Sequence, residues 1–504
     1  MHNGRMQRIG PDRHHPLHSV ATTRGIEESA AATLPAHALM QRAGEQVARL
    51  ALAVAPHAHT VWVACGGGNN GGDGLEAAMH LKRAGKQPVV TWLGDEAHAP
   101  ADAMRSLQRA RAQGVSFQAG PPPGAGLCID ALLGIGSGST RPPEGRMADW
   151  IAHMNAGPAP VLAVDLPSAL DGDTGSGDVA ARARWTLSLL TLKPGLFTGH
   201  GRDAAGDIWF DDLGVSPDAA QFPACAQLAG PPVRGPRPHA SHKGTWGDVA
   251  IIGGAAGMTG AAMLAATSAL HMGAGRVYAS LLDVNAPRFD PVRPELMFRA
   301  LETLDLRRLT AVCGCGGGDA VRHVLARVCS ASAHLVLDAD ALNAIAADPP
   351  LQSLVVARAG RGLQTVMTPH PLEAARLLGL TTGDVQADRL GAAVSLARKF
   401  SSVVVLKGSG SIIAAPLQIP AVNMTGNARL ATAGTGDVLA GMIGALLAAG
   451  VPAFEAACQA VYLHGAAADG WPAGSALTAG KLASAVGGRR LRGEGEMDPG
   501  SSPG

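Results

Sequence analysis

Residues 60–84 read TVWVACGGGNNGGDGLEAAMHLKRA, and this stretch decides the predicted fold of the first half of the chain. The apolar run Thr60–Cys65 has the length and composition of a strand that is buried in a parallel sheet. Gly74–Ala84 is helical by its pattern. A strand that passes through a glycine-rich loop into a helix is typical of α/β folds, in which ligands bind at the carboxyl ends of strands.

The loop between this strand and helix combines glycines with polar side chains. Glycines let the backbone approach a phosphate, and the following helix N-terminus adds a partial positive charge. The spacing is neither Gly-x-Gly-x-x-Gly nor a P-loop, and no Gly-Lys-Ser/Thr follows, so NTP hydrolysis of that type is not expected. Because Asn69, Asn70 and Asp73 add side-chain oxygens, we interpret the loop as a binding site rather than a simple turn.

Strands and helices alternate along the rest of the chain, which predicts an α/β protein with two halves. Further strands are expected at Pro88–Leu93, Gly126–Leu132, Pro160–Asp165, Trp185–Leu192, Asp207–Asp211, Asp248–Gly253, Arg276–Leu281, Ala333–Asp338, Leu363–Met367 and Ser402–Lys407. Helices are expected from near Pro35 to Leu50 and at Ala101–Gln113, Thr259–Met272 and Val438–Ala449. The stretch Val215–Pro238 contains PPVRGPRP and little periodicity, so the domain boundary is placed there.

Composition excludes several classes of protein. The 504 residues carry a formal net charge of +1 and only 3% aromatic residues, so neither a basic surface nor stacking platforms for nucleic acid are expected. The most apolar late stretch, Val438–Pro452, is short and suits a buried helix better than a membrane span. The N-terminus lacks the apolar segment of a secretory signal, and the seven cysteines are scattered, which favours reduced thiols in the cytoplasm.

Carboxylates also lie at the ends of two other predicted strands of the first half. Asp130 and Asp165 each lie at the end of an apolar run, and Ser168 follows the second. Oxygen ligands of this kind suit a hard cation rather than zinc. For Asp171 and Asp173, a role as turn formers is the favoured interpretation.

Three motifs in order, Gly67–Gly74, Asp130–Gly134 and Asp165–Gly175, resemble the NAD(P)H-hydrate epimerase domain over about residues 20–215. The resemblance implies a Rossmann-like three-layer sandwich that interconverts the R and S epimers of hydrated NAD(P)H at a K⁺-dependent site. It implies that Asn70, Asp130 and Ser168 ligate K⁺ and that Asp165 is the catalytic acid/base. The residues that it implies contact the hydrated nucleotide are Asn69, Asn70, Gly71, Gly72, Asp73, Gly134, Ile135, Gly136, Ser137, Gly138, Ser139, Thr140 and Asp165. Ala169 departs from the family, which usually has glycine there.

In the second half, Ala433-Gly434-Thr435-Gly436-Asp437 leads directly into a long apolar helix. Consecutive backbone N–H groups at a helix start stabilise negative charge on a transferred phosphoryl group. Asp437 lies in the first helical turn, where it can take a proton from a substrate hydroxyl. We favour this interpretation over an ordinary helix cap.

Other polar groups end neighbouring strands of this half. Lys407–Ser411 forms a cationic, flexible loop suited to a nucleotide phosphate or ribose. Asp338, Asp340 and Asn343 suit either magnesium-bound waters or the capping of a helix, and the sequence leaves this open. His370, between two prolines, is equally open between a structural and a functional role.

Six motifs over about residues 238–488 closely resemble the ADP/ATP-dependent NAD(P)H-hydrate dehydratase domain, whose fold is ribokinase-like α/β. The motifs are His242-Lys-Gly, Gly257-Met-Thr-Gly-Ala-Ala, Pro294-Glu-Leu-Met, Asp338–Asn343, Thr368–Pro371 and Ala433–Asp437. The resemblance implies that Ala261, Gly316, His370 and Asp437 contact the S-hydrate and that Asp437 is catalytic. It also implies that the adenine nucleotide, ADP or possibly ATP with Mg²⁺, contacts Lys407, Gly408, Ser409, Gly410, Ser411 and Gly436. Gly314-Cys315-Gly-Gly-Gly318 departs from the usual Gly-Pro-Gly-Leu-Gly.

Together the halves resemble the bifunctional bacterial NAD(P)H-hydrate repair enzymes, with NADHX and NADPHX as substrates. The predicted segments are an N-terminal extension at 1–24, the epimerase domain at 25–215, a linker at 216–237, the dehydratase domain at 238–488 and a flexible tail at 489–504. We expect a cytoplasmic homo-oligomer that binds neither nucleic acid nor a membrane.

Two alternatives belong to other classes of function. A ribokinase-like kinase for a vitamin or sugar alcohol shares Ala433–Asp437 but does not predict Thr368–Pro371 together with Asp338–Asn343. The first half as a non-catalytic sensing or scaffold module is disfavoured because Asn70, Asp130, Asp165 and Ser168 are all present.

Overall fold

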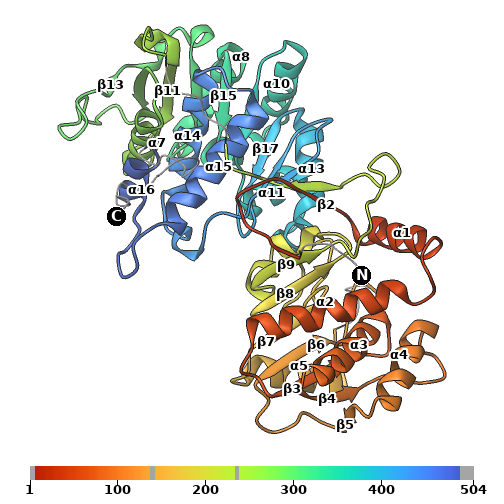
Figure 1. Ribbon diagram of the computed structural model, residues 1–504. Helices are drawn as coiled ribbons and strands as arrows, with labels where there is room; N and C mark the ends of the chain where they lie inside the picture. Colours follow the sequence, from red (N-terminus) through yellow and green to blue (C-terminus); the bar gives the residue numbers. More distant parts are fainter. Residues whose placement is uncertain (1–5, 137–141, 233–237, 488–504) are drawn as a thin grey trace, which may run out of the picture. The chain divides into compact units, whose positions relative to one another are not determined.

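The computed structural model describes residues 6–136, 142–232 and 238–487 (Figure 1). The chain divides into two compact units. The first comprises Met1–Gly230 with Pro369–Met424, and the second comprises Pro231–Thr368 with Thr425–Gly504. Pro369–Met424 thus packs in the same unit as the first half of the chain, and the predicted domain boundaries stay predictions.

The first unit contains a sheet of eight strands in the order β1-β9-β8-β7-β6-β3-β4-β5. All neighbouring pairs are parallel except β1 with β9. The strands are β1 Gln7–Arg8, β3 Thr60–Cys65, β4 Gln87–Trp92, β5 Ser116–Phe117, β6 Leu127–Ala131, β7 Val161–Val164, β8 Trp185–Leu189 and β9 Asp207–Asp211. The helices along this part are α1 Val20–Ala31, α2 Ala38–Val54, α3 Asn69–Arg83, α4 Ala101–Ala112, α5 Gly145–Ala156, the 3₁₀ helix η1 Pro194–Phe197 and α6 Gly201–Ala204.

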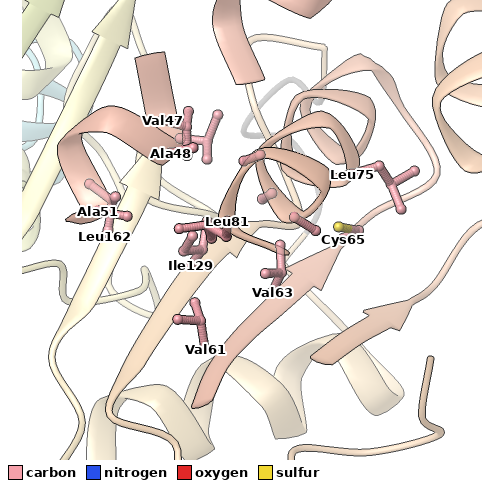
Figure 2. Packing of buried hydrophobic residues seen from close by; sticks show 14 of the residues in the cluster. Val47, Ala48, Ala51, Val61, Val63, Cys65, Leu75, Leu81, Ile129 and Leu162 are labelled. Atoms are coloured by element: carbon pink, nitrogen blue, oxygen red, sulfur yellow. The ribbon is translucent and has the colours of Figure 1, made fainter. Parts of the chain in front are cut away.

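Alternate side chains of β3 point to opposite faces of this sheet and bury two separate cores. Val61, Val63 and Cys65 pack with residues of α2 and α3, such as Val47 and Leu75 (Figure 2). Trp62 and Ala64 pack on the other face with Trp150 and Ile151 of α5. A sheet between two helical layers confirms the predicted Rossmann-like three-layer sandwich.

The first unit also holds five strands in the order β17-β18-β19-β10-β2, with α11–α13 beside them. These elements are β2 His15–Leu17, β10 Ala226–Leu228, α11 Pro371–Leu378, α12 Thr382–Ala387, α13 Arg389–Phe400, β17 Val403–Leu406, β18 Ile412–Ala414 and β19 Ala421–Val422.

The second unit has six parallel strands in the order β13-β12-β11-β14-β15-β16. They are β11 Asp248–Gly253, β12 Arg276–Leu281, β13 Met297–Phe298, β14 Thr310–Cys313, β15 His334–Leu337 and β16 Thr365–Met367. The α-helices are α7 Thr259–Met272, α8 Arg322–Ala331, α9 Asp340–Ala346, α10 Pro349–Gly360, α14 Thr435–Ala448, α15 Ala453–Asp469 and α16 Ala479–Ala485. Single 3₁₀ turns are η2 Lys243–Trp246, η3 Leu301–Thr303, η4 Leu306–Arg308, η5 Asp319–Val321 and η6 Ala428–Leu430.

Each parallel sheet has one topological switch point, where the chain leaves a central strand in one direction and later returns to its other side. In the first unit this point lies between β3 and β6, and in the second between β11 and β14. Ligands of open α/β sheets bind in the crevice at such points. We therefore expect ligands to bind at the loops after these four strands.

The helix after β3 starts at Asn69, so the prediction that it starts at Gly74 was wrong. Its glycines fit tight packing: a Cβ on Gly71 would lie 1.9 Å from the Gly66 carbonyl oxygen, and one on Gly72 would lie 2.5 Å from Met40 Sδ. This tertiary packing outweighs the low helix propensity of glycine and asparagine.

Candidate functional site

At the first switch point, the loop after β3 is in direct backbone contact with the end of β6 and the loop that follows it. The N–H of Gly66 donates to the carbonyl of Ala131 at 3.0 Å, and a Cβ on Gly66 would lie 2.0 Å from the Leu132 carbonyl oxygen. Only glycine permits this approach. The contact places the start of α3, with Asn69 and Asp73, beside the loop that follows β6.

The three predicted K⁺ ligands lie in one hydrogen-bond network around Leu133. Asn70 Nδ2 donates to the Leu133 carbonyl at 3.0 Å, and Ser168 Oγ accepts from the Leu133 N–H at 2.9 Å. Ser168 also donates to both oxygens of Asp130, from Oγ at 2.6 Å and from its backbone N–H at 2.8 Å. Burial raises the pKa of the Asp130 carboxyl, and the Ser168 hydrogen bonds oppose that shift. The donor set consists of oxygens, which fits a hard monovalent or divalent cation.

The predicted nucleotide loop after this network is only partly described. A Cβ on Gly134 would lie 3.0 Å from Asn70 Oδ1, and the Ile135 carbonyl accepts from Arg24 at 2.7 Å. Gly136 is described, whereas Ser137, Gly138, Ser139 and Thr140 lie outside the described residues.

Asp165, the predicted acid/base, is paired with a lysine that the sequence analysis missed. Lys193 Nζ donates to Asp165 Oδ1 and, at 2.8 Å, to the Leu189 carbonyl, and the Lys193 side chain is only 1% exposed. Asp165 has a φ of 64°, an uncommon left-handed conformation outside glycine. Such strain persists where surrounding structure enforces it, and it concentrates at functional sites.

Two further carboxyl groups, those of Glu27 and Asp73, interact electrostatically with Asp165. Burial, followed by the nearby Asp165 carboxylate, raises the pKa of Glu27, which lies on α1. Burial raises the pKa of Asp73 well above its usual range, and Glu27, Asp165 and Glu76 add to this effect. The site therefore combines an ion pair with two carboxyl groups whose pKa is raised, a combination typical of sites of general acid–base chemistry.

Asp73→Asn is expected to stabilise the protein at neutral pH. The unfolded chain loses the Asp73 proton at about pH 4, whereas the folded chain keeps it to higher pH, so stability falls as pH rises between these values. Asparagine removes this titration. Thermal unfolding across a pH series should show the variant above wild type at neutral pH and the gap closing toward about pH 4. Asp178→Asn, at an exposed side chain, is the control. A gap that does not change with pH would contradict the assignment.

Ala169, where the family usually has glycine, adopts a φ of 68°. An L-residue with a Cβ pays roughly 1 kcal/mol for this conformation. The loop after Ser168 therefore keeps a glycine-like backbone despite the substitution.

At the second switch point, the backbone at the end of β11 is likewise in direct contact with the loop after β14. The N–H of Gly254 donates to the carbonyl of Cys315 at 2.9 Å, and a Cβ on Gly253 would lie 2.3 Å from that oxygen. Gly316 has a φ of 57°, and a Cβ on it would lie 2.9 Å from the Cβ of Ala261. The two predicted substrate contacts Gly316 and Ala261 therefore lie side by side.

Asp437 lies in the first turn of α14, as predicted, with Gly434 as the N-cap residue at a φ of 92°. Gly436 precedes it in the same turn. One ligand atom each from Asp437, Asp338 and Cys315 lie within 4.8 Å of one another, and Asp338 and Cys315 are buried. The structure thus brings the predicted catalytic carboxylate to a second carboxylate at the end of β15. Cys315 is one of two residues, with Gly317, by which the Gly314–Gly318 loop departs from the family pattern. No motif in the sequence indicates that its thiol lies near Asp437.

Two of the polar residues after β15, Asp338 and Asp340, make hydrogen bonds to neighbouring segments. Thr368 Oγ1 donates to Asp338 Oδ1 at 2.7 Å, which orients this carboxylate beside Asp437. Asp340 Oδ2 accepts from the Gly318 N–H at 2.8 Å and so holds the neighbouring loop. Neither residue is the N-cap of α9, which is Ala339.

His370 caps a helix in the first unit. Its Nδ1 accepts from the N–H groups of Leu372 and Glu373 at 3.1 and 3.3 Å, and Glu373 Oε2 accepts from the His370 N–H at 2.8 Å. This reciprocal arrangement is a capping box at the start of α11. Because Nδ1 accepts, the ring proton of neutral His370 lies on Nε2, which is 3.2 Å from Glu373 Oε1. The imidazole is half-exposed, so the cap leaves room for the predicted contact with substrate.

The loop Lys407–Ser411, predicted to bind the nucleotide, follows β17. The Lys407 N–H donates to the Pro369 carbonyl at 2.9 Å, and Ser411 Oγ donates to the Gly408 carbonyl at 3.2 Å. Gly408 and Gly410 have φ values of 137° and 63°, and Ser409 between them is exposed. The loop thus has a glycine-dependent backbone, which permits close approach to a phosphate or ribose.

Among the described residues, no helix combines the length and the apolar character needed to cross a membrane.

Two protein families match this chain. The family described as NAD(P)H-hydrate dehydratase matches residues 249–486, and the family described as YjeF-related protein N-terminus matches residues 36–195. The bifunctional NAD(P)H-hydrate repair enzyme of Escherichia coli is 36% identical over 464 residues, which cover 88% of this chain and 87% of that protein. The ADP-dependent (S)-NAD(P)H-hydrate dehydratase of Neisseria meningitidis is 45% identical over 254 residues, covering 49% of this chain and 84% of that protein.

A solved structure that matches part of this chain is the ADP/ATP-dependent NAD(P)H-hydrate dehydratase of Bacillus subtilis co-crystallised with ATP and Mg²⁺. It is 29% identical with a TM-score of 0.41, and the match covers 50% of this chain and 91% of that one.

Proposed function

This chain belongs to the family of bifunctional NAD(P)H-hydrate repair enzymes, and from that premise we propose that it restores NADH and NADPH whose nicotinamide ring has added water. The first half interconverts the R and S hydrates, and the second half dehydrates the S form with ADP. The observation that carries the proposal is the presence of two separate switch-point sites, one with the Asp165–Lys193 pair and one with Asp437 at a helix N-terminus.

For the dehydration, Asp437 accepts the proton of the hydrate hydroxyl as that oxygen attacks the terminal phosphorus of ADP. The bond from that phosphorus to the bridging oxygen breaks, and AMP leaves. The backbone N–H groups of Gly434–Gly436, at the positive end of α14, stabilise the charge on the phosphoryl group. Phosphate is a far better leaving group than hydroxide, so loss of phosphate and of a ring proton then restores the dihydropyridine. Hydrate and ADP are thereby converted to NAD(P)H, AMP and phosphate.

Lys407–Ser411 is proposed to contact the nucleotide, and Ala261, Gly316 and His370 to contact the hydrate. Mg²⁺ bound with the nucleotide would neutralise phosphate charge, and Asp338 is the carboxylate suited to hold it because Thr368 orients it beside Asp437.

For the epimerisation, Asp165 is proposed to act as the acid/base that moves a proton on the hydrated ring. Lys193, which donates to Asp165 Oδ1, would hold the Asp165 side chain in place. K⁺ would be held by oxygens of Asn70, Asp130 and Ser168 and would supply positive charge next to the bound hydrate. Asn69, Asp73 and the Gly134–Gly136 backbone are proposed to bind the hydrated nucleotide. A cytoplasmic location and a homo-oligomeric state remain predictions.

The test of function is to add ADP, and separately ATP, to hydrated NADH and NADPH while following the near-ultraviolet absorbance of the reduced nicotinamide and released phosphate together. The proposal expects both signals to rise in equal amounts. A stable phosphorylated product without recovered absorbance would instead identify a metabolite kinase. Replacing K⁺ by Na⁺ or Li⁺ should slow epimerisation and leave dehydration of the S form unaffected.

A further inference from the structure

The turn that follows η1 touches the predicted nucleotide loop through its backbone and its side chains. Thr198 Oγ1 lies 3.2 Å from the carbonyl oxygens of both Ser409 and Gly410, to which it donates, and Thr198 is 1% exposed. The Gly199 N–H donates to the Ser409 carbonyl at 3.2 Å, and Ser409 Oγ donates to the Gly199 carbonyl at 3.0 Å. All of these residues belong to the first compact unit.

The two backbones meet without space for a side chain. A Cβ on Gly410 would lie 2.0 Å from the Phe197 carbonyl oxygen, and Gly410 has a φ of 63°. Both the positive φ and the short distance to the Phe197 carbonyl therefore require glycine at position 410.

A buried arginine joins the same turn to the base of the loop. Arg389 Nε donates to Thr198 Oγ1 at 3.0 Å, and its Nη2 donates to the Lys407 carbonyl at 3.2 Å. Its Nη1 donates to Gln386 Oε1 at 2.7 Å, and the residue is 1% exposed. Burial lowers the pKa of Arg389 to about 10, so the guanidinium is still charged at neutral pH. The Thr198 hydroxyl thus accepts from a cation and donates to the loop, which fixes its direction.

The turn is packed equally closely against the loop that follows Ser168. A Cβ on Gly195 would lie 2.1 Å from the Asp171 carbonyl oxygen, and one on Gly175 would lie 2.2 Å from the Thr198 carbonyl oxygen. The Gly195 N–H donates to the Gly172 carbonyl at 2.8 Å. The segment between Lys193 and Gly199 therefore packs against residues 171–175 on one side and against Gly408–Ser411 on the other.

We infer that Thr198, which lies in the predicted epimerase domain, is a positioning residue for the nucleotide loop of the dehydration reaction. Arg389 is its partner in this role. The inference rests on the proposed function, because it assigns the adenine nucleotide to Lys407–Ser411. Because Thr198 is buried, it acts through the loop: it holds the Ser409 and Gly410 carbonyls and thereby keeps the loop's N–H groups preformed for a nucleoside diphosphate. A preformed loop lowers the ordering cost of binding.

The test is Thr198→Val in the full chain, with KM for ADP and kcat measured on the S-hydrate. Loss of a hydrogen bond to a charged group predicts a rise in KM for ADP of about tenfold, with kcat within about twofold. Thr198→Ser, which keeps the hydroxyl, should restore KM. The matched control is Thr186→Val, since Thr186 also has a buried hydroxyl that donates to a backbone carbonyl, that of Ala205 at 2.7 Å. This control should leave KM for ADP unchanged.

Arg389→Lys tests the same contact from the other side and should also raise KM for ADP. The inference is overturned if Thr198→Val leaves KM for ADP unchanged, or if Thr186→Val raises it equally. It is also overturned if Thr198→Ser behaves like the valine variant. A wild-type protein that shows no ADP-dependent dehydration would contradict the proposed function itself, a result distinct from any of these.

Discussion

Replacing Asp437 with alanine abolishes ADP-dependent dehydration of the S-hydrate and leaves epimerisation at the wild-type rate. The carboxylate lies in the first turn of α14 near Asp338, and in the proposed mechanism it alone takes the hydroxyl proton during phosphoryl transfer. Loss of a general base costs about 10²–10⁴-fold in rate. Asp437→Asn keeps the shape of the side chain but cannot accept the proton, so it should be equally inactive.

Initial rates of phosphate release and of NAD(P)H recovery, measured on separated S-hydrate, check this expectation. Epimerisation in the same preparation is the internal control for folding of the rest of the chain. Dehydration that persists in Asp437→Asn at more than about a tenth of the wild-type rate would remove Asp437 from the role of base.

The second large effect is expected at the Asp165–Lys193 pair. Asp165→Asn should slow epimerisation by about 10²-fold or more and leave dehydration of the S-hydrate intact. Lys193→Met should in addition destabilise the fold by about 3–5 kcal/mol, because it leaves a buried carboxylate without its counter-ion. The double variant should recover much of that stability without recovering epimerisation, since no unpaired charge remains.

Chemical denaturation of the two single variants and the double variant forms the cycle that checks the pair. Additive losses of stability would show that Asp165 and Lys193 do not interact in the folded protein. Normal epimerisation in Asp165→Asn would instead favour the alternative that the first half is a sensing or scaffold module.

Much of the fold follows from local sequence. Strands Thr60–Cys65 and Asp248–Gly253 and helix Thr259–Met272 are confirmed residue for residue, because apolar runs and helical periods there end at clear polar or glycine boundaries. The helix α1 was missed because VATTRGIEESAA has little apolar periodicity. Glu27, which it carries, was therefore missed as well.

Candidate site residues were named where a motif is contiguous in sequence, and their contact partners were missed where these are distant in sequence. Asn70, Asp130 and Ser168 do lie in one hydrogen-bond network around Leu133, since all three lie at or near the carboxyl ends of strands in one parallel sheet. Lys193 lies 28 residues after Asp165, and only the fold brings them together. A lysine at the end of the apolar run Trp185–Leu192 was the available signal. No sequence motif marks Thr198 or Arg389. An arginine is expected at the protein surface, and only the fold shows that Arg389 is buried against Thr198.

The central claim is that two sites on one chain act in sequence on the two epimers, and one measurement tests it most directly. An equilibrated mixture of R- and S-NADPHX is incubated with ADP and K⁺, and recovery of the reduced nicotinamide is followed to completion. Wild type should recover both epimers, Asp165→Asn should stop after the S fraction, and Asp437→Ala should recover none. Recovery of the R fraction by Asp165→Asn at the wild-type rate, or no ADP-dependent recovery by wild type, would contradict the claim.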